Sequence, residues 1–157
     1  MDFNFVKINK IFAEEIAYKW KYKGKYSFYD MTDDKEDLKE FLNPKKWENT
    51  YAVLNNDDEL VGFYSFYFKE EIMWIGFGLK PELTGNGLGE KFVQKGIDYG
   101  IKTYKYDKDH IMLAVAEFNK RAIKLYQKLG FQTIEKYDQK TNGGIYKFRK
   151  MKKVINK

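Results

Sequence analysis

The sequence predicts a single mixed α/β domain that extends over residues 1–157. Apolar residues recur every three or four positions in some segments, which indicates helices, and alternate or run continuously in others, which indicates strands. The length agrees with one domain, because 157 residues fit one hydrophobic core and leave little room for a second. No proline- or serine-rich linker and no internal repeat divides the chain.

The N-terminal part is expected to form one strand and two helices. Apolar and polar residues alternate from Phe3 to Asn9, as in a half-buried strand. One face of the next helix is formed by Ala13, Ile16, Ala17 and Trp20. Residues 22–32 have no clean period and are expected to form a loop rich in aromatic rings. Acidic residues open a second helix at 33–43, which should end before Pro44.

The middle of the chain predicts an antiparallel meander. Strand-like residues occupy 50–56, 60–69 and 70–80, and the segments between them are short and polar. A helical spacing then extends from Leu88 to Tyr104. We therefore expect three consecutive strands followed by a helix of about four turns.

The C-terminal part predicts a strand, a helix and a hairpin. Residues 111–118 form a nearly continuous apolar run, typical of a strand covered on both faces. Residues 119–130 start with asparagine and end with glycine, as a short helix does. The last two strands should meet in a turn at 141–144, where Asn-Gly-Gly favours positive φ.

Composition excludes several kinds of chemistry. The chain has no cysteine, which excludes disulfides and thiolate catalysis, and its single histidine, His110, excludes a histidine-based metal cluster. No apolar run approaches the roughly 20 residues that span a bilayer, and the N-terminus lacks a signal-peptide core. We therefore expect a cytoplasmic protein without a metal cofactor or membrane partner.

The charge favours an anionic ligand without requiring one. The formal net charge is +6, from 29 basic and 23 acidic residues that are mixed along the sequence. Such a surplus favours a phosphate-bearing ligand and attracts nucleic acid weakly. Aromatic residues make up 18% of the chain, so some rings are expected in a ligand pocket as well as in the core.

Three alternating glycines, Gly85, Gly87 and Gly89, stand between an expected strand and the helix that follows. Backbone amides at a helix N-terminus bind anions, phosphate above all, and glycines let the chain wrap closely around one. A P-loop is excluded because no Lys-Ser or Lys-Thr follows, and a dinucleotide loop because the spacing is GxGxG.

The stretch TGNGLG resembles the pyrophosphate loop, R/Q-x-x-G-x-G/A, of the GNAT N-acetyltransferases, which bind acetyl-CoA. The preceding LKPEL is similar to the stretch that joins their fourth strand to this loop. Thr84 stands where most members have Arg or Gln, so one side-chain contact is expected to be weakened. Gly87 and Gly89 occupy the positions that the backbone cradle requires.

A second motif, NKRAIKLYQKLGF, resembles the N-xx-A-xx-x-Y-xx-x-GF signature of the same family. Asn119 and Tyr126 are two helical turns apart and share a face, with the small Ala122 between them. A tyrosine hydroxyl, with a reference pKa of about 10, is protonated at neutral pH and can act as a general acid. The alternative is an ordinary amphipathic helix that Asn119 caps and in which Tyr126 is half-buried.

The resemblance implies a GNAT-type domain, with a mostly antiparallel sheet of about seven strands and about four helices. In this family the fourth and fifth strands splay apart, and the pantetheine arm of the donor enters the gap. The resemblance places the thioester at the backbone of Phe77 and Leu79, and the sulfur near Tyr126. The remaining donor-binding residues that it implies are Thr84, Gly85, Asn86, Gly87, Leu88, Gly89, Asn119 and Ala122.

The general base is less clearly indicated. Bacterial ribosomal-protein alanine acetyltransferases, the members this chain is taken to resemble most, carry a glutamate early in the fifth strand. That position is Ala114 in this chain, and Glu117 is displaced by three residues. Glu70 and Glu71, at the start of the expected fourth strand, are further candidates, and Glu71 is preferred with Glu117. A solvated turn charge is favoured over a base for each of them, and water is then the alternative base.

The segment YSFYD lies where the family builds its acceptor wall. Its candidate substrate-binding residues are Tyr26, Phe28, Tyr29 and Asp30. Three rings and a carboxylate can hold a cationic amine. The alternative is a loop that packs over the core while Asp30 caps the next helix.

The sequence therefore predicts direct acetyl transfer from acetyl-CoA to a primary amine, with Tyr126 as general acid. A small-molecule or amino-acid acceptor is favoured over a protein N-terminus, because the glutamate of the ribosomal type is missing. A non-catalytic acyl-CoA-binding module is the first alternative and an RNA-binding domain the second. A homodimer through the last strands and propionyl-CoA as donor stay open.

Overall fold

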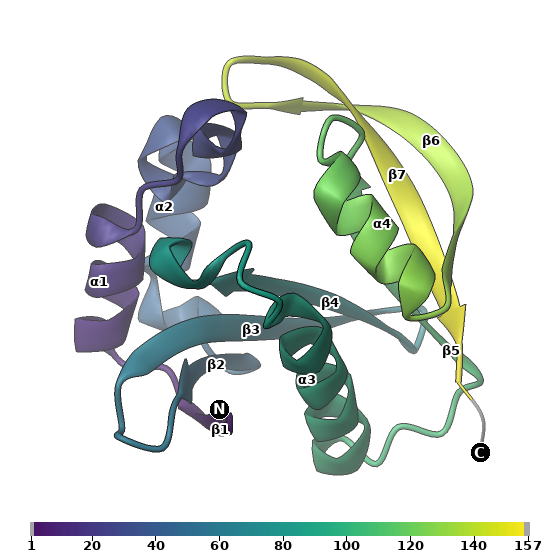
Figure 1. The fold of residues 1–157 in the computed structure, drawn as a ribbon, viewed down its shortest axis with the longest axis horizontal. Coiled ribbons are helices and arrows are strands. Elements are labelled where there is room, and N and C mark those ends of the chain that lie inside the picture. Colours follow the sequence, from purple (N-terminus) through teal and green to yellow (C-terminus); the bar gives the residue numbers. More distant parts are fainter. Residues whose placement is uncertain (1, 156–157) are drawn as a thin grey trace. The chain divides into compact units, whose positions relative to one another are not determined.

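The computed structural model describes residues 2–155 and contains a seven-stranded mixed sheet (Figure 1). The strands are β1 (Asn4–Lys7), β2 (Thr50–Leu54), β3 (Leu60–Lys69), β4 (Ile72–Leu79), β5 (His110–Ala116), β6 (Phe131–Thr141) and β7 (Gly144–Val154). Their order in the sheet is β1-β2-β3-β4-β5-β7-β6. β4 runs parallel to β5, whereas β1–β2, β2–β3, β5–β7 and β6–β7 are antiparallel.

Helices stand between the strands in the predicted order. The α-helices are α1 (Lys10–Lys19), α2 (Lys35–Phe41), α3 (Gly89–Thr103) and α4 (Lys120–Lys128). Short 3₁₀ helices are η1 (Gly24–Tyr29), η2 (Met31–Asp33), η3 (Pro44–Lys46) and η4 (Pro81–Leu83). The predicted α/β class and the splayed fourth and fifth strands are confirmed. The segment expected as a loop at 22–32 is instead mostly 3₁₀ helix, whose short turns leave no apolar period of 3.6 residues.

The side chains of Asn9 and Asp34 set the starts of the first two helices. Asn9 accepts a hydrogen bond from the amide of Phe12, and Asp34 accepts from the amides of Glu36 and Asp37. Each bond satisfies amide groups that have no partner inside the helix. The acidic run suggested that the second helix begins at residue 33. In the structure it begins at Lys35, after the cap Asp34.

The described chain divides into two compact units. The first contains the residues up to Ser65 together with Phe77–Leu88, and the second contains Phe66–Gly76 together with the residues from Gly89 onward. In the first unit, α1 packs on the sheet through a core cluster formed by Ile8, Ala13, Ile16, Trp20, Ala52 and Leu60. The prediction that the chain forms one domain stays a prediction.

In the second unit, α3 presents an apolar face whose buried residues are Phe92, Val93, Gly96, Ile97 and Gly100. A Cβ on Gly100 would lie 2.5 Å from the ring of Phe66, which is itself buried. The helix therefore approaches β3 closely at this glycine. In the same unit α4 lies beside the β6–β7 hairpin (Figure 1).

A tyrosine hydroxyl joins the starts of the two parallel strands. Trp74 lies beside Met112 in the β4–β5 register. The Tyr106 hydroxyl accepts a hydrogen bond from the Met73 amide at 3.1 Å and donates one to the His110 carbonyl. It therefore takes the place of a backbone rung between β4 and β5.

The β6–β7 turn and the surface agree with the sequence. Asn142 and Gly143 have φ of 51° and 75°, so the predicted hairpin turn is confirmed.

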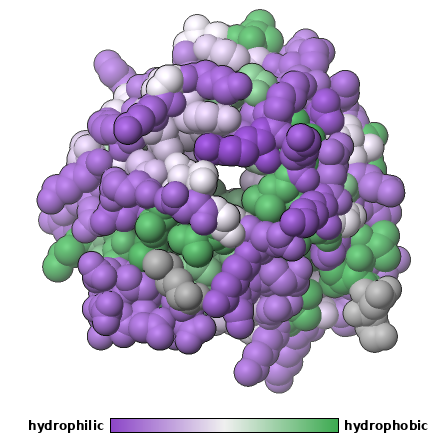
Figure 2. Space-filling view, in the orientation of Figure 1, coloured by the Kyte–Doolittle hydropathy of each residue, from purple (hydrophilic) through white to green (hydrophobic). Residues whose placement is uncertain are grey.

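Hydrophilic side chains cover most of the face displayed in Figure 2, as expected for a chain with 33% charged residues. Within residues 2–155, no helix is both long and apolar enough to cross a membrane.

Candidate active site

The glycine loop connects η4 to α3. Gly85 and Gly87 have φ of 76° and 78°, in the left-handed region that residues with a Cβ rarely adopt. Gly89 is the first residue of α3, whose first amides lack intrahelical partners as in any α-helix. The loop thus has the backbone conformation and the position of a helix N-terminal anion site.

Thr84 turns its hydrogen-bond donors inward. Its hydroxyl donates to the Pro81 carbonyl at 2.7 Å, and its amide donates to the same oxygen at 3.2 Å. The Asn86 side-chain amide donates to the Glu82 carbonyl at 3.1 Å. Thr84 therefore braces the entry of the loop, and the following amides are the donors suited to an anion.

Gly89 has a packing role that the spacing alone did not reveal. A Cβ at this position would lie 2.9 Å from Cδ2 of Leu125 on α4. Within the second unit, this glycine therefore lets the first turn of α3 approach α4 closely.

The end of β4 contains the residues expected to face the thioester. The Phe77 ring lies 5.0 Å from that of Tyr64, centroid to centroid. The Lys80 amide donates to the Val61 carbonyl at 2.8 Å, which keeps this end of β4 attached to β3. The Leu79 carbonyl accepts a hydrogen bond from the Tyr22 hydroxyl, also at 2.8 Å.

Helix α4 carries the second motif. The Asn119 side chain accepts from the Ala122 amide at 3.1 Å and so acts as the N-cap. Tyr126 is buried, with 9% of its surface exposed, and its ring packs edge-on against Phe131 at 6.0 Å. Asn119 is thus the helix cap that the alternative interpretation required, whereas Tyr126 is buried rather than half-buried.

Glu117 stands directly after β5 among basic side chains. Nε and Nη2 of Arg149 both donate to its carboxylate, the latter at 2.9 Å. The ammonium groups of Lys120 and Lys136 lie 3.3 and 3.5 Å from it. The bonds from Arg149, more than any other effect, lower the pKa of Glu117 to about 2. A carboxylate held in this way has little affinity for a proton from an amine.

Glu71 lies in the turn between β3 and β4. Its φ is 69°, and its side chain, 82% exposed, lies 3.5 Å from the Lys108 ammonium. In the structure it is a solvated turn charge with one ionic partner. Among the described residues, no group of three or more histidine, aspartate or glutamate side chains is arranged to hold a metal ion.

The candidate acceptor residues gather on η1 and its C-terminal end. The Phe28 and Tyr29 rings pack edge to face with centroids 5.3 Å apart, and the Lys25 ammonium lies 5.5 Å from the Tyr26 ring. Asp30 accepts a hydrogen bond from the Tyr22 amide at 2.8 Å. The Asp30 carboxylate therefore binds the chain just before η1, whereas the side chain that caps α2 is that of Asp34.

The GNAT acetyltransferase family model matches residues 13–131, which include both motifs. The chain belongs to the GNAT acetyltransferase family. A bovine (Bos taurus) relative described as thialysine N-epsilon-acetyltransferase is 33% identical over 84 residues, 48% of this chain. That alignment covers 46% of the bovine protein, so the chain spans about half the length of this relative.

Solved structures of the GNAT family share the fold. A spermidine N-acetyltransferase from Vibrio cholerae in complex with CoA and spermine has a TM-score of 0.74 at 17% identity, covering 97% of this chain and 95% of that one. A GNAT-family acetyltransferase from Bacillus anthracis has a TM-score of 0.72 at 18% identity, covering 97% and 94%. The family model confirms the predicted GNAT resemblance, whereas the ribosomal-protein subtype stays a prediction, and these structures show the fold.

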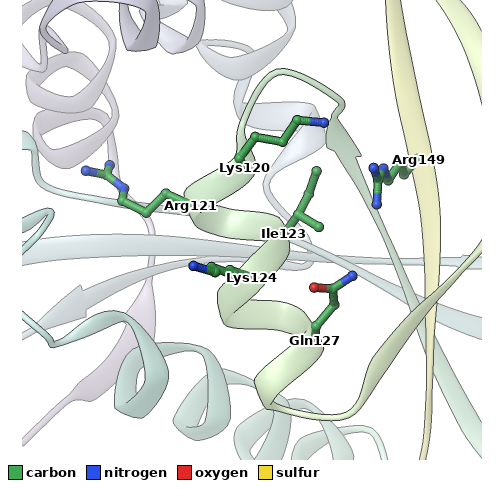
Figure 3. Close-up of a pocket in the computed structure, with 6 residues that line it drawn as sticks. All are labelled: Lys120, Arg121, Ile123, Lys124, Gln127 and Arg149. Atoms are coloured by element: carbon green, nitrogen blue, oxygen red, sulfur yellow. The ribbon is translucent and has the colours of Figure 1, made fainter.

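This GNAT-family chain has a basic hollow on α4 that we did not predict (Figure 3). The open space, about 560 Å³, is lined by Lys120, Arg121, Ile123, Lys124, Gln127 and Arg149. Most of the basic side chains that line it belong to α4. The run KRAIK, with basic residues at helical spacing, could have predicted this hollow from the sequence. Tyr22 was also missed, because its partners lie 8 and 57 positions away in the sequence.

Proposed function

We propose that this chain is an acetyl-CoA-dependent N-acetyltransferase that acts on the primary amine of a small molecule. The observation that carries the proposal is the loop before α3, where Gly85 and Gly87 are left-handed and Thr84 turns its donors inward. The remaining amides of the loop and the dipole of α3 favour a bound pyrophosphate. Membership of the GNAT family supports acetyl-CoA as the ligand.

Each residue of the cradle has a proposed task. The backbone of Gly85, Asn86, Gly87, Leu88 and Gly89 would bind the pyrophosphate, with Thr84 as the brace of the loop. The backbone of Phe77 and Leu79 would hold the thioester end of the donor. Asn119 and Ala122 would border the pantetheine. The lysines of the hollow on α4 add positive charge that favours an anionic donor.

Tyr126 is the proposed general acid. Acetyl-CoA supplies a thioester whose carbonyl carbon accepts the lone pair of a neutral amine. As the C–S bond breaks, the Tyr126 hydroxyl would donate its proton to the sulfur and regain one from water. A chain without cysteine offers no thiol for an acyl-enzyme intermediate, so direct transfer is the simplest route.

Water is the proposed acceptor of the amine proton. Glu117 is committed to Arg149 and has a pKa of about 2, which makes it a poor base. Glu71 is exposed in a turn and paired with Lys108. We therefore place neither carboxylate at the reacting nitrogen, and direct transfer needs only that the amine be deprotonated by solvent.

A small aliphatic amine is the proposed acceptor class. The bovine relative is described as a thialysine acetyltransferase and the Vibrio protein as a spermidine acetyltransferase, and both of these acceptors carry primary amines. Tyr26, Phe28 and Tyr29 on η1 supply rings, and Asp30 a carboxylate, for such a cation. A peptide N-terminus is the second candidate, disfavoured by Ala114 at the position of the glutamate of the ribosomal type.

Calorimetric titration with acetyl-CoA tests the donor site. Micromolar binding by the wild type that Gly87→Trp abolishes would support the cradle. Gly143→Trp is the matched control, because Gly143 also has positive φ, 75°, and a Cβ there would likewise meet no atom within 4 Å. Equal loss in both variants would attribute the effect to backbone strain, and no binding by the wild type would refute the proposal.

An amine panel tests the reaction. Turnover of a small amine that Tyr126→Phe lowers by about 10²-fold or more, while acetyl-CoA still binds, would support general acid catalysis. Tyr18→Phe, an exposed tyrosine of α1, is the control. Binding of acetyl-CoA without turnover of any amine or peptide would favour a non-catalytic acyl-CoA-binding module.

Location and assembly belong to the same proposal. We propose a cytoplasmic enzyme, in keeping with its small-molecule chemistry. A homodimer through β7 also stays a proposal, for which Ile145, 73% exposed beside the hairpin turn, offers an apolar contact. Sedimentation of the wild type and of Ile145→Lys would test the dimer.

A further inference from the structure

The last peptide of β4 has one side attached to β3 and one side facing away from it. The Lys80 amide donates to Val61 of β3 at 2.8 Å. In a trans peptide the carbonyl and the amide point in opposite directions, so the Leu79 carbonyl points away from β3. Its partner there is the Tyr22 hydroxyl, at 2.8 Å. Tyr22 therefore lies along the edge of β4 that is opposite β3.

Tyr22 also holds the segment that carries the candidate acceptor residues. Its backbone amide donates to the Asp30 carboxylate at 2.8 Å, at the C-terminal end of η1. One residue thus connects β4 through its side chain and η1 through its backbone. Burial of Tyr22, aided by the charges of Asp30 and Glu82, raises its pKa above the ordinary value. Its hydroxyl is therefore a hydrogen-bond donor at every pH suited to an assay.

We infer that Tyr22 is a positioning residue that fixes the amine-binding segment Gly24–Asp30 against the β4 edge that receives the acyl donor. The inference rests on the proposed function. Both bonds of Tyr22 lie within the first unit, as does the whole segment. Tyr22 touches neither reacting group in this assignment, and acts by keeping the amine at the distance and angle that direct transfer requires.

The test compares Tyr22→Phe, which keeps the ring and removes the hydroxyl, with the control Tyr18→Phe on the exposed face of α1. We expect kcat/KM for the amine to fall about tenfold in Tyr22→Phe, because small displacements of reacting groups are costly. The dissociation constant for acetyl-CoA should change much less than kcat/KM, because the glycine loop is untouched and only the Leu79 carbonyl of the donor site loses a partner. Amide hydrogen exchange in residues 24–30 should accelerate without ligand.

Other outcomes overturn the inference. One such outcome is an unchanged kcat/KM. The other is a lower kcat with unchanged KM that matches a lower folded fraction of the variant, because a merely structural role of Tyr22 would give that result. If Tyr22→Phe fails to fold, Asp30→Ala breaks the other connection of Tyr22. Because Asp30 is itself a proposed amine-binding residue, the readout for this variant is amide hydrogen exchange without ligand: faster exchange in residues 24–30 supports the inference, and unchanged exchange overturns it. Absence of acetyl-CoA binding by the wild type would remove the proposed function as well, whereas a failure confined to the variants removes this inference alone.

Discussion

Single hydroxyl and carboxylate groups determine how the strand ends are held. Tyr106 bridges β4 and β5 by accepting from Met73 and donating to His110. Tyr106→Phe leaves both backbone groups without this partner, at a cost of about 1–3 kcal/mol in the free energy of unfolding. Urea denaturation of this variant and of Tyr18→Phe measures the difference. Equal stability of the two variants would show that water replaces the hydroxyl.

The pH dependence of stability should contain a contribution from Glu117. Its pKa is lowered from 4.5 to about 2, chiefly by hydrogen bonds from Arg149. A group whose pKa is lower in the folded state stabilises the protein fully above its unfolded pKa. That stabilisation is lost as the pH falls from about 4.5 through about 2.

Glu117→Gln should therefore be less stable than the wild type at neutral pH and should converge with it in acid. Thermal unfolding midpoints between pH 7 and pH 2 check this expectation, with Glu135→Gln, on β6, as the control. A constant difference between Glu117→Gln and the wild type across this range would contradict it. The same variant should keep its acetyl-transfer rate at neutral pH if water is the base.

At the scale of the element, helix α3 contains a glycine, Gly100, which favours helix poorly but allows a close contact with Phe66. Gly100→Ala should gain about 1 kcal/mol from helix propensity. The new methyl group would lie 2.5 Å from the buried Phe66 ring, and such overpacking costs about 1–3 kcal/mol. Because the clash exceeds the gain, we expect a net loss of stability in urea. Lys95→Ala, at an exposed position of α3, changes little besides helix propensity and should not destabilise.

Helices and strands were predictable where period and caps agreed. Ala13, Ile16 and Ala17 placed α1 correctly, and Asn142 with Gly143 placed the hairpin turn. Residues 22–32 were not predictable, because 3₁₀ turns leave no apolar period. The hydrogen bond from the Tyr22 hydroxyl to the Leu79 carbonyl was not predictable either, because it joins residues 57 positions apart through a single hydroxyl group.

The candidate site was predictable from motifs rather than from contacts. Gly85 and Gly87 were chosen because glycines let a loop wrap closely around an anion, and in the structure both have positive φ. The sequence does not reveal ion pairs between distant residues. Glu117 was therefore a candidate base, although in the structure it is hydrogen-bonded to Arg149, 32 positions later. Only the fold brings β5 and β7 side by side and reveals that pair.

For the whole molecule, the charge is divided unequally between the two units. The first unit has 11 lysines and 14 acidic residues, whereas the second has 18 basic and 9 acidic residues. Their formal charges are therefore −3 and +9, which add up to the net +6 of the chain. Helix α4 and its basic hollow belong to the second unit.

Donor binding should therefore weaken as salt is added. CoA carries several negative charges, and screening shortens the reach of the positive field from about 10 Å at 0.1 M to 3 Å at 1 M ionic strength. We expect the dissociation constant of CoA to rise about tenfold between 0.05 and 0.5 M salt, as for electrostatically assisted ligands. Dephospho-CoA, which lacks the 3′-phosphate, should show a smaller rise. Identical salt dependence of the two ligands would mean that the basic surface of the second unit does not act on the 3′-phosphate.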